Sequence, residues 1–315
     1  MIEQFKKEVD KGLSSQPKSL PSKFFYDKTG DELFVKIMNM PEYYLSRSEL
    51  EIFHEQSGKI IKGLNLNRNQ YFELIELGAG DGTKTKELLE VLHTEGYKFE
   101  YIPIDISQNA LDQLERKLTK ELPHVMVNTK QGDYFTMLAS LHNTKHQKIV
   151  FFLGSNLGNM TDKEASSFIS KLSSNLRNND KLLIGLDLIK SADIVLPAYN
   201  DSEGVTRAFN MNLLSRINNE LGGDFNIDTF IHKPTYTTKT GIAQSCLVST
   251  IDQTLTLSST GKTYQFIEGE EIQTEISRKY NNEILTRIVE DTDFKITKKL
   301  TDKKGYFANY ILHRV

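Results

Sequence analysis

The chain has 315 residues with 39 basic and 42 acidic side chains, and its formal net charge of −3 predicts no electrostatic attraction to nucleic acid or membrane. Its single cysteine, Cys246, excludes an internal disulfide and fits a reducing compartment. Because the start of the chain is polar and no apolar run is long enough to span a bilayer, we expect a cytoplasmic protein of one large or two modest domains.

The most informative stretch is a strand followed by a glycine turn. Residues 71–77 have strand character and run into a glycine-rich turn at 78–82, after which residues 84–93 can form a helix. A second apolar strand at 101–105 ends in Asp105. This succession is typical of the nucleoside-binding half of a doubly wound sheet, in which glycines let the backbone approach the ligand and the acid accepts hydrogen bonds from ribose hydroxyls.

Two features of the turn favour S-adenosylmethionine over a nicotinamide dinucleotide as the bound nucleoside. Gly78, Gly80 and Gly82 alternate, whereas the dinucleotide fold has the spacing Gly-x-Gly-x-x-Gly. Asp81 lies inside the turn, where its charge would repel a phosphate. A sulfonium with an amino-acid tail carries no phosphate. A nicotinamide-dependent oxidoreductase and a catalytically silent binding module are the two disfavoured alternatives from other classes.

The elements that follow continue the alternation of strand and helix. Residues 148–153 form the near-continuous apolar run of a central parallel strand, and Thr161 and Glu164 have the spacing of a capping box. Other predicted elements are a helix at 108–122, strands at 125–131 and 181–187, and a terminal hairpin of strands at 284–298 and 306–314. The sequence therefore predicts an α/β fold with five parallel strands, completed by an antiparallel hairpin, with its ligand-binding loops at the carboxyl ends of the strands.

Two regions lie outside this alternation. Residues 1–60 precede the first strand, and residues 199–285 interrupt the sheet with a helix at 205–221 and several strand-like pieces. We expect these two regions to form a substrate-binding cap domain. Residues 61–198 and 286–315 would then form the cofactor-binding domain.

Five sequence blocks resemble a known family, the histidine-specific Nα-methyltransferases of ergothioneine biosynthesis. The blocks occur in the family's order and spacing over nearly the whole chain, at residues 25–34, 41–47, 154–159, 197–201 and 274–277. The resemblance implies a Rossmann-like class I methyltransferase sheet and S-adenosylmethionine as the cofactor. It also implies methylation of the α-amino group of L-histidine, up to the trimethylated betaine hercynine.

The resemblance also implies roles for individual residues. Asp105 would hold the ribose of the cofactor, and Asp133 with Tyr134 would hold its adenine. The remaining residues expected at the cofactor are Gly78, Gly80 and Lys84. The residues expected at the amino-acid substrate are Tyr43, Asn159, Tyr199, Ser245, Glu275, Ile276 and Ser277, with Tyr26 close to its amino group.

The spacing of Glu275 and Ser277 suits recognition of an imidazole ring. Side chains two residues apart in an extended segment point to the same face, and a carboxylate with a hydroxyl can address two ring nitrogens. Ser245 departs from the family, which carries a methionine against the substrate ring. A shorter, polar residue enlarges the pocket or admits a water, so the alternative substrate is another amino acid or an indole derivative such as a prenylated tryptophan.

The amine must lose a proton before each methyl transfer, and the sequence leaves Tyr26 and water as alternative acceptors. The seven histidines are scattered, and neither His232 nor His313 has a spacing that suggests a metal site. We therefore expect no metal, a small-molecule substrate and a monomeric protein.

Overall fold

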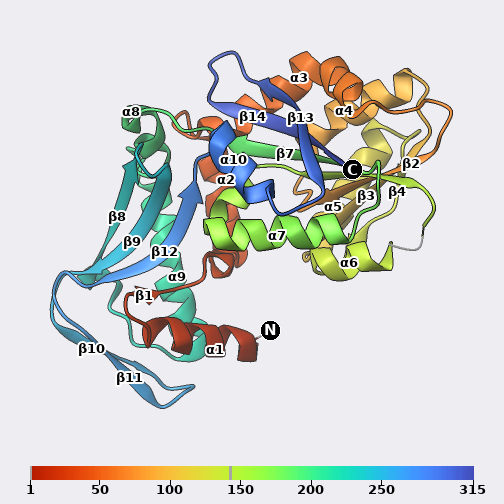
Figure 1. The fold of residues 1–315 in the computed structure, drawn as a ribbon. Helices are drawn as coiled ribbons and strands as arrows, with labels where there is room; N and C mark the ends of the chain where they lie inside the picture. Colours follow the sequence, from red (N-terminus) through yellow and green to blue (C-terminus); the bar gives the residue numbers. More distant parts are fainter. Residues whose placement is uncertain (1, 142–143) are drawn as a thin grey trace. The chain divides into compact units, whose positions relative to one another are not determined.

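The computed structural model describes residues 2–141 and 144–315 and divides the chain into two compact units (Figure 1). The parallel-sheet unit comprises residues 45–189 and 279–315. The antiparallel-sheet unit comprises residues 1–44 and 190–278. No helix among the described residues is long and apolar enough to cross a membrane.

The parallel-sheet unit contains the predicted α/β sheet. Its strand order is β13-β14-β7-β6-β2-β3-β4, with β5 beside β3, and β14 is antiparallel to both of its neighbours. The parallel sheet with a terminal antiparallel hairpin is therefore confirmed. The strands are β2 Phe72–Leu77, β3 Phe99–Asp105, β4 Met126–Val127, β5 Lys130–Gln131, β6 Gln147–Phe152, β7 Lys181–Asp187, β13 Phe294–Thr301 and β14 Phe307–Arg314.

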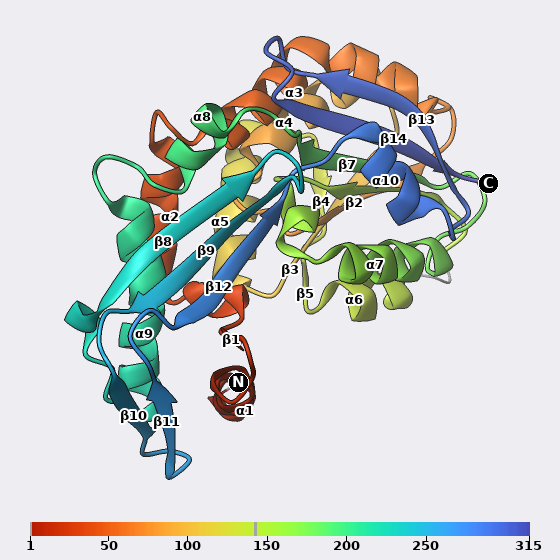
Figure 2. The ribbon, with the colours of Figure 1, turned by 60° about the vertical axis from the view of Figure 1, so that its left-hand side comes forward.

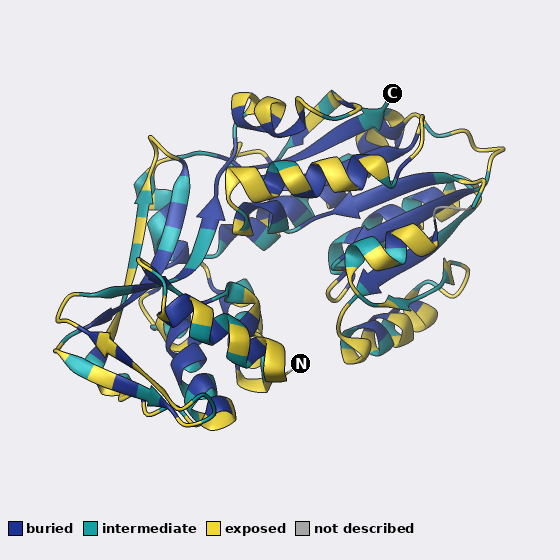
Figure 3. Cartoon of the chain, turned by 60° about the horizontal axis from the view of Figure 1, so that its bottom comes forward, coloured by how far each residue is buried: buried dark blue, intermediate teal, exposed yellow. Residues whose placement is uncertain are grey.

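Helices cover both faces of this sheet, which is why its central strands β2, β6 and β7 and the neighbouring β14 are buried along most of their length (Figure 3). The apolar core on one face is shared with α3 (Tyr44–Leu64), α4 (Thr83–Thr94) and α5 (Gln108–Glu121). The core on the other face is shared with α6 (Tyr134–Ser140), α7 (Asp162–Ser174) and α10 (Asn282–Val289). The predicted capping box is present at the start of α7, with Thr161 and Glu164 bonded reciprocally.

The prediction of a strand beginning at Ile284 was wrong. Residues 282–289 form α10, and the strand of the hairpin begins only at Phe294. The side chain of Asn281 accepts a hydrogen bond from the Ile284 amide and so caps the helix. The buried residues Ile284, Leu285, Ile288 and Val289 have helical spacing, and the β-branched residues among them suggested a strand.

The division of the chain also differs from the expected one. Residues 45–60 belong to the parallel-sheet unit because α3 buries Ile52, Phe53 and Ile60 in the core of that sheet. Residues 190–198 belong to the antiparallel-sheet unit, and the boundary expected at residue 285 lies after Arg278.

The antiparallel-sheet unit is built on the order β1-β12-β9-β8, and Figure 2 shows β8, β9 and β12 side by side. Helix α9 (Val205–Leu221) packs on one face of this sheet and buries its apolar residues there. The strands are β1 Lys18–Ser19, β8 Phe230–Thr237, β9 Ile242–Ser249 and β12 Glu271–Arg278, with a separate hairpin of β10 Gln253–Leu257 and β11 Lys262–Phe266. The other helices are α1 Ile2–Leu13, α2 Lys28–Asn39 and α8 Ala192–Val195, with short 3₁₀ helices η1 Ser22–Phe25 and η3 Leu196–Ala198.

Candidate functional site

The parallel sheet changes its winding direction between β2 and β6, because β3 lies on one side of β2 and β6 on the other. This is where a doubly wound sheet binds its ligand. Gly78 follows β2 and Gly154 follows β6, with φ angles of 72° and 73°. The side-chain amide nitrogen of Asn156 lies close to both glycines. It would be 3.8 Å from a Cβ atom built on Gly78 and 3.6 Å from one built on Gly154. Gly80 has no atom within 4 Å of its Cβ position, so its backbone is open to a ligand.

Three of the expected cofactor residues lie close together beside this turn. A Cβ atom on Gly78 would lie 2.6 Å from the Tyr134 hydroxyl. Burial and the negative charge of Asp105 raise the pKa of Tyr134 to about 12, so this phenol stays protonated near the carboxylate. Asp105 is half-buried at the end of β3 and accepts a hydrogen bond of 2.9 Å from the Ser107 amide. Asp133 precedes Tyr134 and caps α6 by accepting two amide hydrogen bonds from its first turn.

The charge inside the glycine turn disfavours a phosphate. Asp81 Oδ1 accepts a hydrogen bond of 3.1 Å from the Thr83 amide, and its carboxylate lies 3.6 Å from the Lys117 ammonium. Burial opposes ionisation of Asp81, but the hydrogen bonds from Thr83 and the charge of Lys117 outweigh it and lower the pKa of the carboxyl group. The turn therefore carries a fixed negative charge beside the helix N-terminus at which a pyrophosphate would otherwise bind.

Lys84 was expected at the cofactor. Its ammonium is bonded to Glu49, a residue that was not among the predicted site residues. Its Nζ atom lies 2.5 Å from Oε2 of Glu49, which belongs to α3 and is fully buried. Lys84 itself keeps a quarter of its side chain exposed, and its Nζ would lie 3.8 Å from a Cβ atom on Gly154. No local pattern marks Glu49, because its partners come from distant parts of the chain.

A second buried carboxyl group lies in the strand that leads into the glycine turn. Glu76 is 2% exposed, and its Oε2 accepts a hydrogen bond of 2.5 Å from the Tyr101 hydroxyl. Burial raises the pKa of Glu76 to about 7, although the Tyr101 hydrogen bond and the charge of Lys84 work in the opposite direction. The folded protein therefore binds a proton at Glu76 that the unfolded chain releases at lower pH.

The Glu76→Gln variant should become more stable relative to the wild type as the pH rises from about 4.5 to about 7. A carboxyl group whose pKa is higher in the folded protein than in the unfolded chain stabilises the fold at low pH. This stabilisation is complete below the pKa of the unfolded chain and is lost as the pH rises through the pKa of the folded protein. The loss is at most about 3 kcal/mol, from 1.36 kcal/mol per pKa unit. Thermal unfolding of both proteins between pH 4 and pH 8 measures the difference. A difference that does not change with pH would contradict this assignment.

In the antiparallel-sheet unit, a β-bulge decides where Glu275 points. Gln273 pairs with Cys246 and Glu275 pairs with Ser245, so Thr274 is an extra residue in β12. Directly opposite residues share a face of a sheet, and neighbouring residues along β9 point to opposite faces. Gln273 and Glu275 therefore lie on opposite faces although they are two residues apart, because a bulge re-aims the strand that contains it.

The bulge places Glu275 on the face of the sheet that α9 covers. Ser245 shares its face with Leu247, which is fully buried in the core that α9 completes. The register is regular from Glu275 onwards, so Ser277 lies on the same face, as expected. Ser245 is fully buried, and its hydroxyl has no hydrogen-bond partner among the described residues. Ile276 was expected at the substrate, but its side chain points to the opposite face.

Two polar residues without a predicted role, Asn210 and Thr274, tie α9 to the bulge. The Thr274 hydroxyl lies 2.8 Å from Oδ1 of Asn210 and 3.0 Å from the carbonyl oxygen of Ser245. Asn210 is fully buried on α9, and Thr274 is 2% exposed. A polar residue on the buried face of an otherwise apolar helix was the signal available for Asn210.

Tyr26 and Tyr43 are brought together by an aromatic cluster of the same unit. The ring of Tyr26 lies 5.5 Å from that of Phe34 and 5.8 Å from that of Phe209, and Phe34 lies 6.5 Å from Tyr43. Tyr26 is 46% exposed. Tyr199 follows η3 and is buried. Phenol rings with accessible faces suit a site that holds a substituted ammonium.

The expected site residues are thus distributed over both units. Those assigned to the cofactor all lie in the parallel-sheet unit, together with Asn159, which is exposed at the end of the 3₁₀ helix η2 (Asn156–Asn159). The other residues assigned to the substrate lie in the antiparallel-sheet unit: Tyr26, Tyr43, Tyr199, Ser245, Glu275, Ile276 and Ser277.

The residues at β2 and β3 fit a nucleoside that has an amino-acid tail and no phosphate. The Asp105 carboxylate could accept hydrogen bonds from ribose hydroxyls, and the open backbone at Gly80 would allow a close approach. The Lys84 ammonium could meet a carboxylate, whereas the ionised Asp81 disfavours a pyrophosphate. S-adenosylmethionine has this set of groups.

Comparison with known proteins gives the same result. The sequence model of a family described as histidine-specific methyltransferase, SAM-dependent, matches residues 5–314. The histidine N-alpha-methyltransferase of Mycolicibacterium smegmatis is 32% identical over 97% of this chain and 94% of its own length. That of Mycobacterium tuberculosis is 33% identical over 96% of this chain and 92% of its own. Ergothioneine biosynthesis protein 1 of Schizosaccharomyces pombe is 29% identical over 93% of this chain and 38% of its own length. The chain therefore belongs to the family of histidine-specific, S-adenosylmethionine-dependent methyltransferases.

Proposed function

We propose that the protein transfers methyl groups from S-adenosylmethionine to the α-amino nitrogen of L-histidine, up to the trimethylated product hercynine. Membership of the family supports histidine as the substrate. The observation that carries the proposal is the bulge in β12, which turns Glu275 towards the face that also carries Ser245 and Ser277. A carboxylate accepts the N–H of an imidazole, and a hydroxyl can donate to its other nitrogen.

The chemistry that S-adenosylmethionine supplies when bound is an electrophilic methyl group on a sulfonium, with a neutral thioether as the leaving group. The residues of the chain act by positioning. Asp105 holds the ribose, Asp133 and Tyr134 hold the adenine, and Lys84 holds the tail. Tyr43, Asn159 and Tyr199 contact the amino-acid part of the substrate. Tyr26 lies near the amino group, where its hydroxyl and solvent water are the two acceptors for the proton.

We further propose that the protein acts in the cytoplasm as a monomer and that hercynine is its contribution to ergothioneine synthesis. The one cysteine, Cys246, is free and buried, and burial raises the pKa of its thiol to about 12, which keeps the thiol protonated. The name of the fission-yeast relative supports the place in ergothioneine synthesis.

The substrate is tested by incubating the purified protein with methyl-labelled S-adenosylmethionine and each of the twenty amino acids. We expect label in histidine far above that in any other amino acid, because among the twenty only histidine carries an N–H donor and a nitrogen acceptor on one rigid ring, for Glu275 and Ser277 respectively. Incorporation into another amino acid, with none into histidine, would overturn the proposal while leaving the cofactor assignment intact.

The second candidate is N-methylation of an indole derivative, and Ser245 is the observation that favours it. Its fully buried hydroxyl has no partner among the described residues, so it could bond a ligand or a water at the position where the resemblance places a larger methionine. An indole has one N–H donor and no acceptor, so it would leave one of Glu275 and Ser277 without a ring partner. Turnover on histidine compared with tryptophan, prenylated tryptophan and tyrosine separates the two candidates.

A further inference from the structure

Glu49 of α3 joins three segments of the parallel-sheet unit through one buried carboxylate. Its Oε2 accepts hydrogen bonds from the Lys84 ammonium at 2.5 Å and from the Gly154 amide at 2.9 Å. Its Oε1 accepts a hydrogen bond of 3.0 Å from the side-chain amide of Asn309 in β14. A Cβ atom at Gly185 in β7 would lie 1.9 Å from Oε1, so the glycine leaves the space that the carboxylate fills.

Two of the three partners of Glu49, Lys84 and Gly154, lie where the sheet changes its winding direction. Gly154 follows β6, Lys84 lies in the first turn of α4 after the glycine turn of β2, and β2 and β6 are neighbours. Glu49 is fully buried, whereas Lys84 keeps a quarter of its side chain exposed. A buried carboxylate thus anchors an ammonium that still reaches the edge of the sheet at which a ligand binds.

We propose that Glu49 is a positioning residue, which orients the Lys84 ammonium and the Gly154 turn to receive the carboxylate of the cofactor's amino-acid tail. The inference rests on the proposed function only in taking S-adenosylmethionine as the cofactor. A lysine side chain has many rotamers, and fixing one of them before the ligand arrives removes that entropy cost from binding. Glu49 makes no contact with the nucleoside in this account, so its effect is confined to the tail.

The sign of the effect distinguishes positioning from simple neutralisation. If Glu49 only cancelled the charge of Lys84, its removal would leave a more positive site and would tighten binding of the tail's carboxylate. If Glu49 orients Lys84, the Glu49→Gln variant offers the ammonium a neutral amide oxygen in place of a charged anchor, and the weaker anchor lowers the affinity for the tail. Two product-like ligands separate these outcomes: S-adenosylhomocysteine carries the tail, and 5′-methylthioadenosine shares the nucleoside and the thioether but lacks it.

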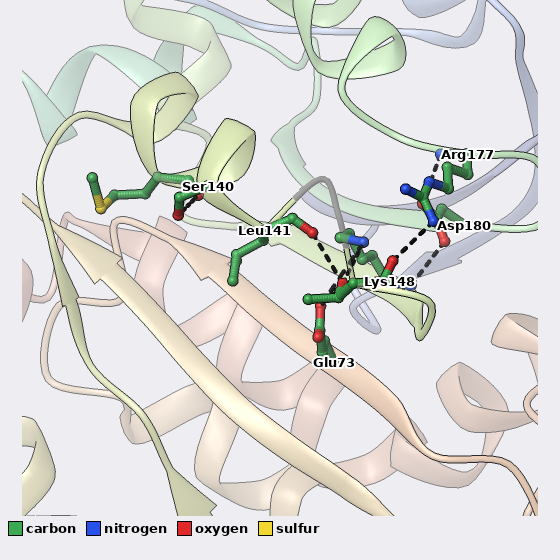
Figure 4. Close-up of polar contacts among 8 residues, drawn as sticks. Glu73, Ser140, Leu141, Lys148, Arg177 and Asp180 are labelled. Carbon is green, nitrogen blue, oxygen red and sulfur yellow. Dashed lines mark hydrogen bonds and ion pairs between the residues drawn. The ribbon is translucent and has the colours of Figure 1, made fainter.

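Glu73 offers a matched control in the same unit. It is a buried carboxylate near the start of β2, at the opposite edge of the sheet from the glycine turn. Its Oε2 accepts a hydrogen bond of 3.0 Å from Thr144 and lies 3.9 Å from the Lys148 ammonium, and Figure 4 shows it beside Lys148. Glu73→Gln therefore removes a buried carboxylate near a lysine without altering the ligand-binding edge.

The experiment measures the dissociation constants of both ligands by calorimetry for the wild type, Glu49→Gln, Glu73→Gln, Lys84→Gln and the Glu49→Gln/Lys84→Gln double variant. We expect Glu49→Gln to raise the dissociation constant of S-adenosylhomocysteine about ten-fold, as for loss of one charge-assisted interaction. The dissociation constant of 5′-methylthioadenosine should be almost unchanged. Glu73→Gln should leave the ratio of the two constants as in the wild type. In the Lys84→Gln background, Glu49→Gln should add nothing further, because the two residues act as a unit.

Three results would overturn the proposal: an unchanged ratio, tighter binding of S-adenosylhomocysteine, or equal weakening of both ligands. If Glu49→Gln does not fold, Glu49→Asp can replace it, because aspartate keeps the charge but withdraws it by one methylene. The ratio of the dissociation constants of the two ligands is then compared with that of the wild type in the same way. Neither ligand contains histidine, so a wrong substrate assignment would not affect the outcome. A wild-type protein that binds 5′-methylthioadenosine as tightly as S-adenosylhomocysteine would instead count against the cofactor.

Discussion

Replacing Glu275 by alanine should weaken L-histidine binding roughly ten- to a hundred-fold, because a desolvated imidazole N–H left without its acceptor costs about 1–3 kcal/mol. Binding of S-adenosylhomocysteine should be almost unchanged, since the residues assigned to the cofactor lie in the other unit of the chain. Calorimetric titration of the variant with each ligand in turn measures both effects.

Gln273 supplies the matched control for this prediction. It lies on the same strand two residues earlier, and without the bulge it would share a face with Glu275. Because the bulge places it on the opposite face, Gln273→Ala should leave histidine affinity as in the wild type. Equal histidine affinities for Glu275→Ala and the wild type would show that the ring is recognised elsewhere.

Replacing Asp105 by alanine should have the reverse pattern. We expect roughly ten- to a hundred-fold weaker binding of S-adenosylhomocysteine, because hydrogen bonds from ribose hydroxyls to a carboxylate are charge-assisted and contribute about 1.5–3 kcal/mol. The residues assigned to the imidazole remain intact in this variant, so histidine measured alone should bind as it does to the wild type.

The role of Asp105 in the turn after β3 requires a second variant. Its Oδ1 accepts the Ser107 amide hydrogen, and asparagine can still accept that bond although it has no charge. Asp105→Asn should therefore bind S-adenosylhomocysteine more weakly than the wild type and more tightly than Asp105→Ala. Full recovery of affinity in Asp105→Asn would assign the loss to the turn and not to the ribose.

The sequence predicts those elements whose signal is local. The strand at 181–187 and the helix at 205–221 have the predicted bounds, because the strand is a continuous run buried at every position and the helix is bounded by Gly204 and Gly222. The capping box at Thr161 was predicted from its spacing and is present. The parallel sheet and its terminal hairpin were predicted from the alternation of strand and helix, which is also a local pattern repeated along the chain.

The features that escaped prediction depend on contacts between distant segments. Glu49 is bonded to residues of α4, of the loop after β6 and of β14, and no local spacing marks those pairings. The bulge at Thr274 is defined by register against β9, which a single strand does not reveal. For α10, the β-branched residues pointed to a strand, but the Asn281 cap and packing in the core favoured the helix.

The position of the methyl groups in the product decides whether the protein is a histidine Nα-methyltransferase. The purified protein is incubated with L-histidine and an excess of S-adenosylmethionine, and the product is isolated for mass spectrometry and NMR. We expect up to three methyl groups, all on the α-nitrogen, with an unmodified imidazole ring. Methyl groups on a ring nitrogen, or histidine recovered unmodified, would contradict it.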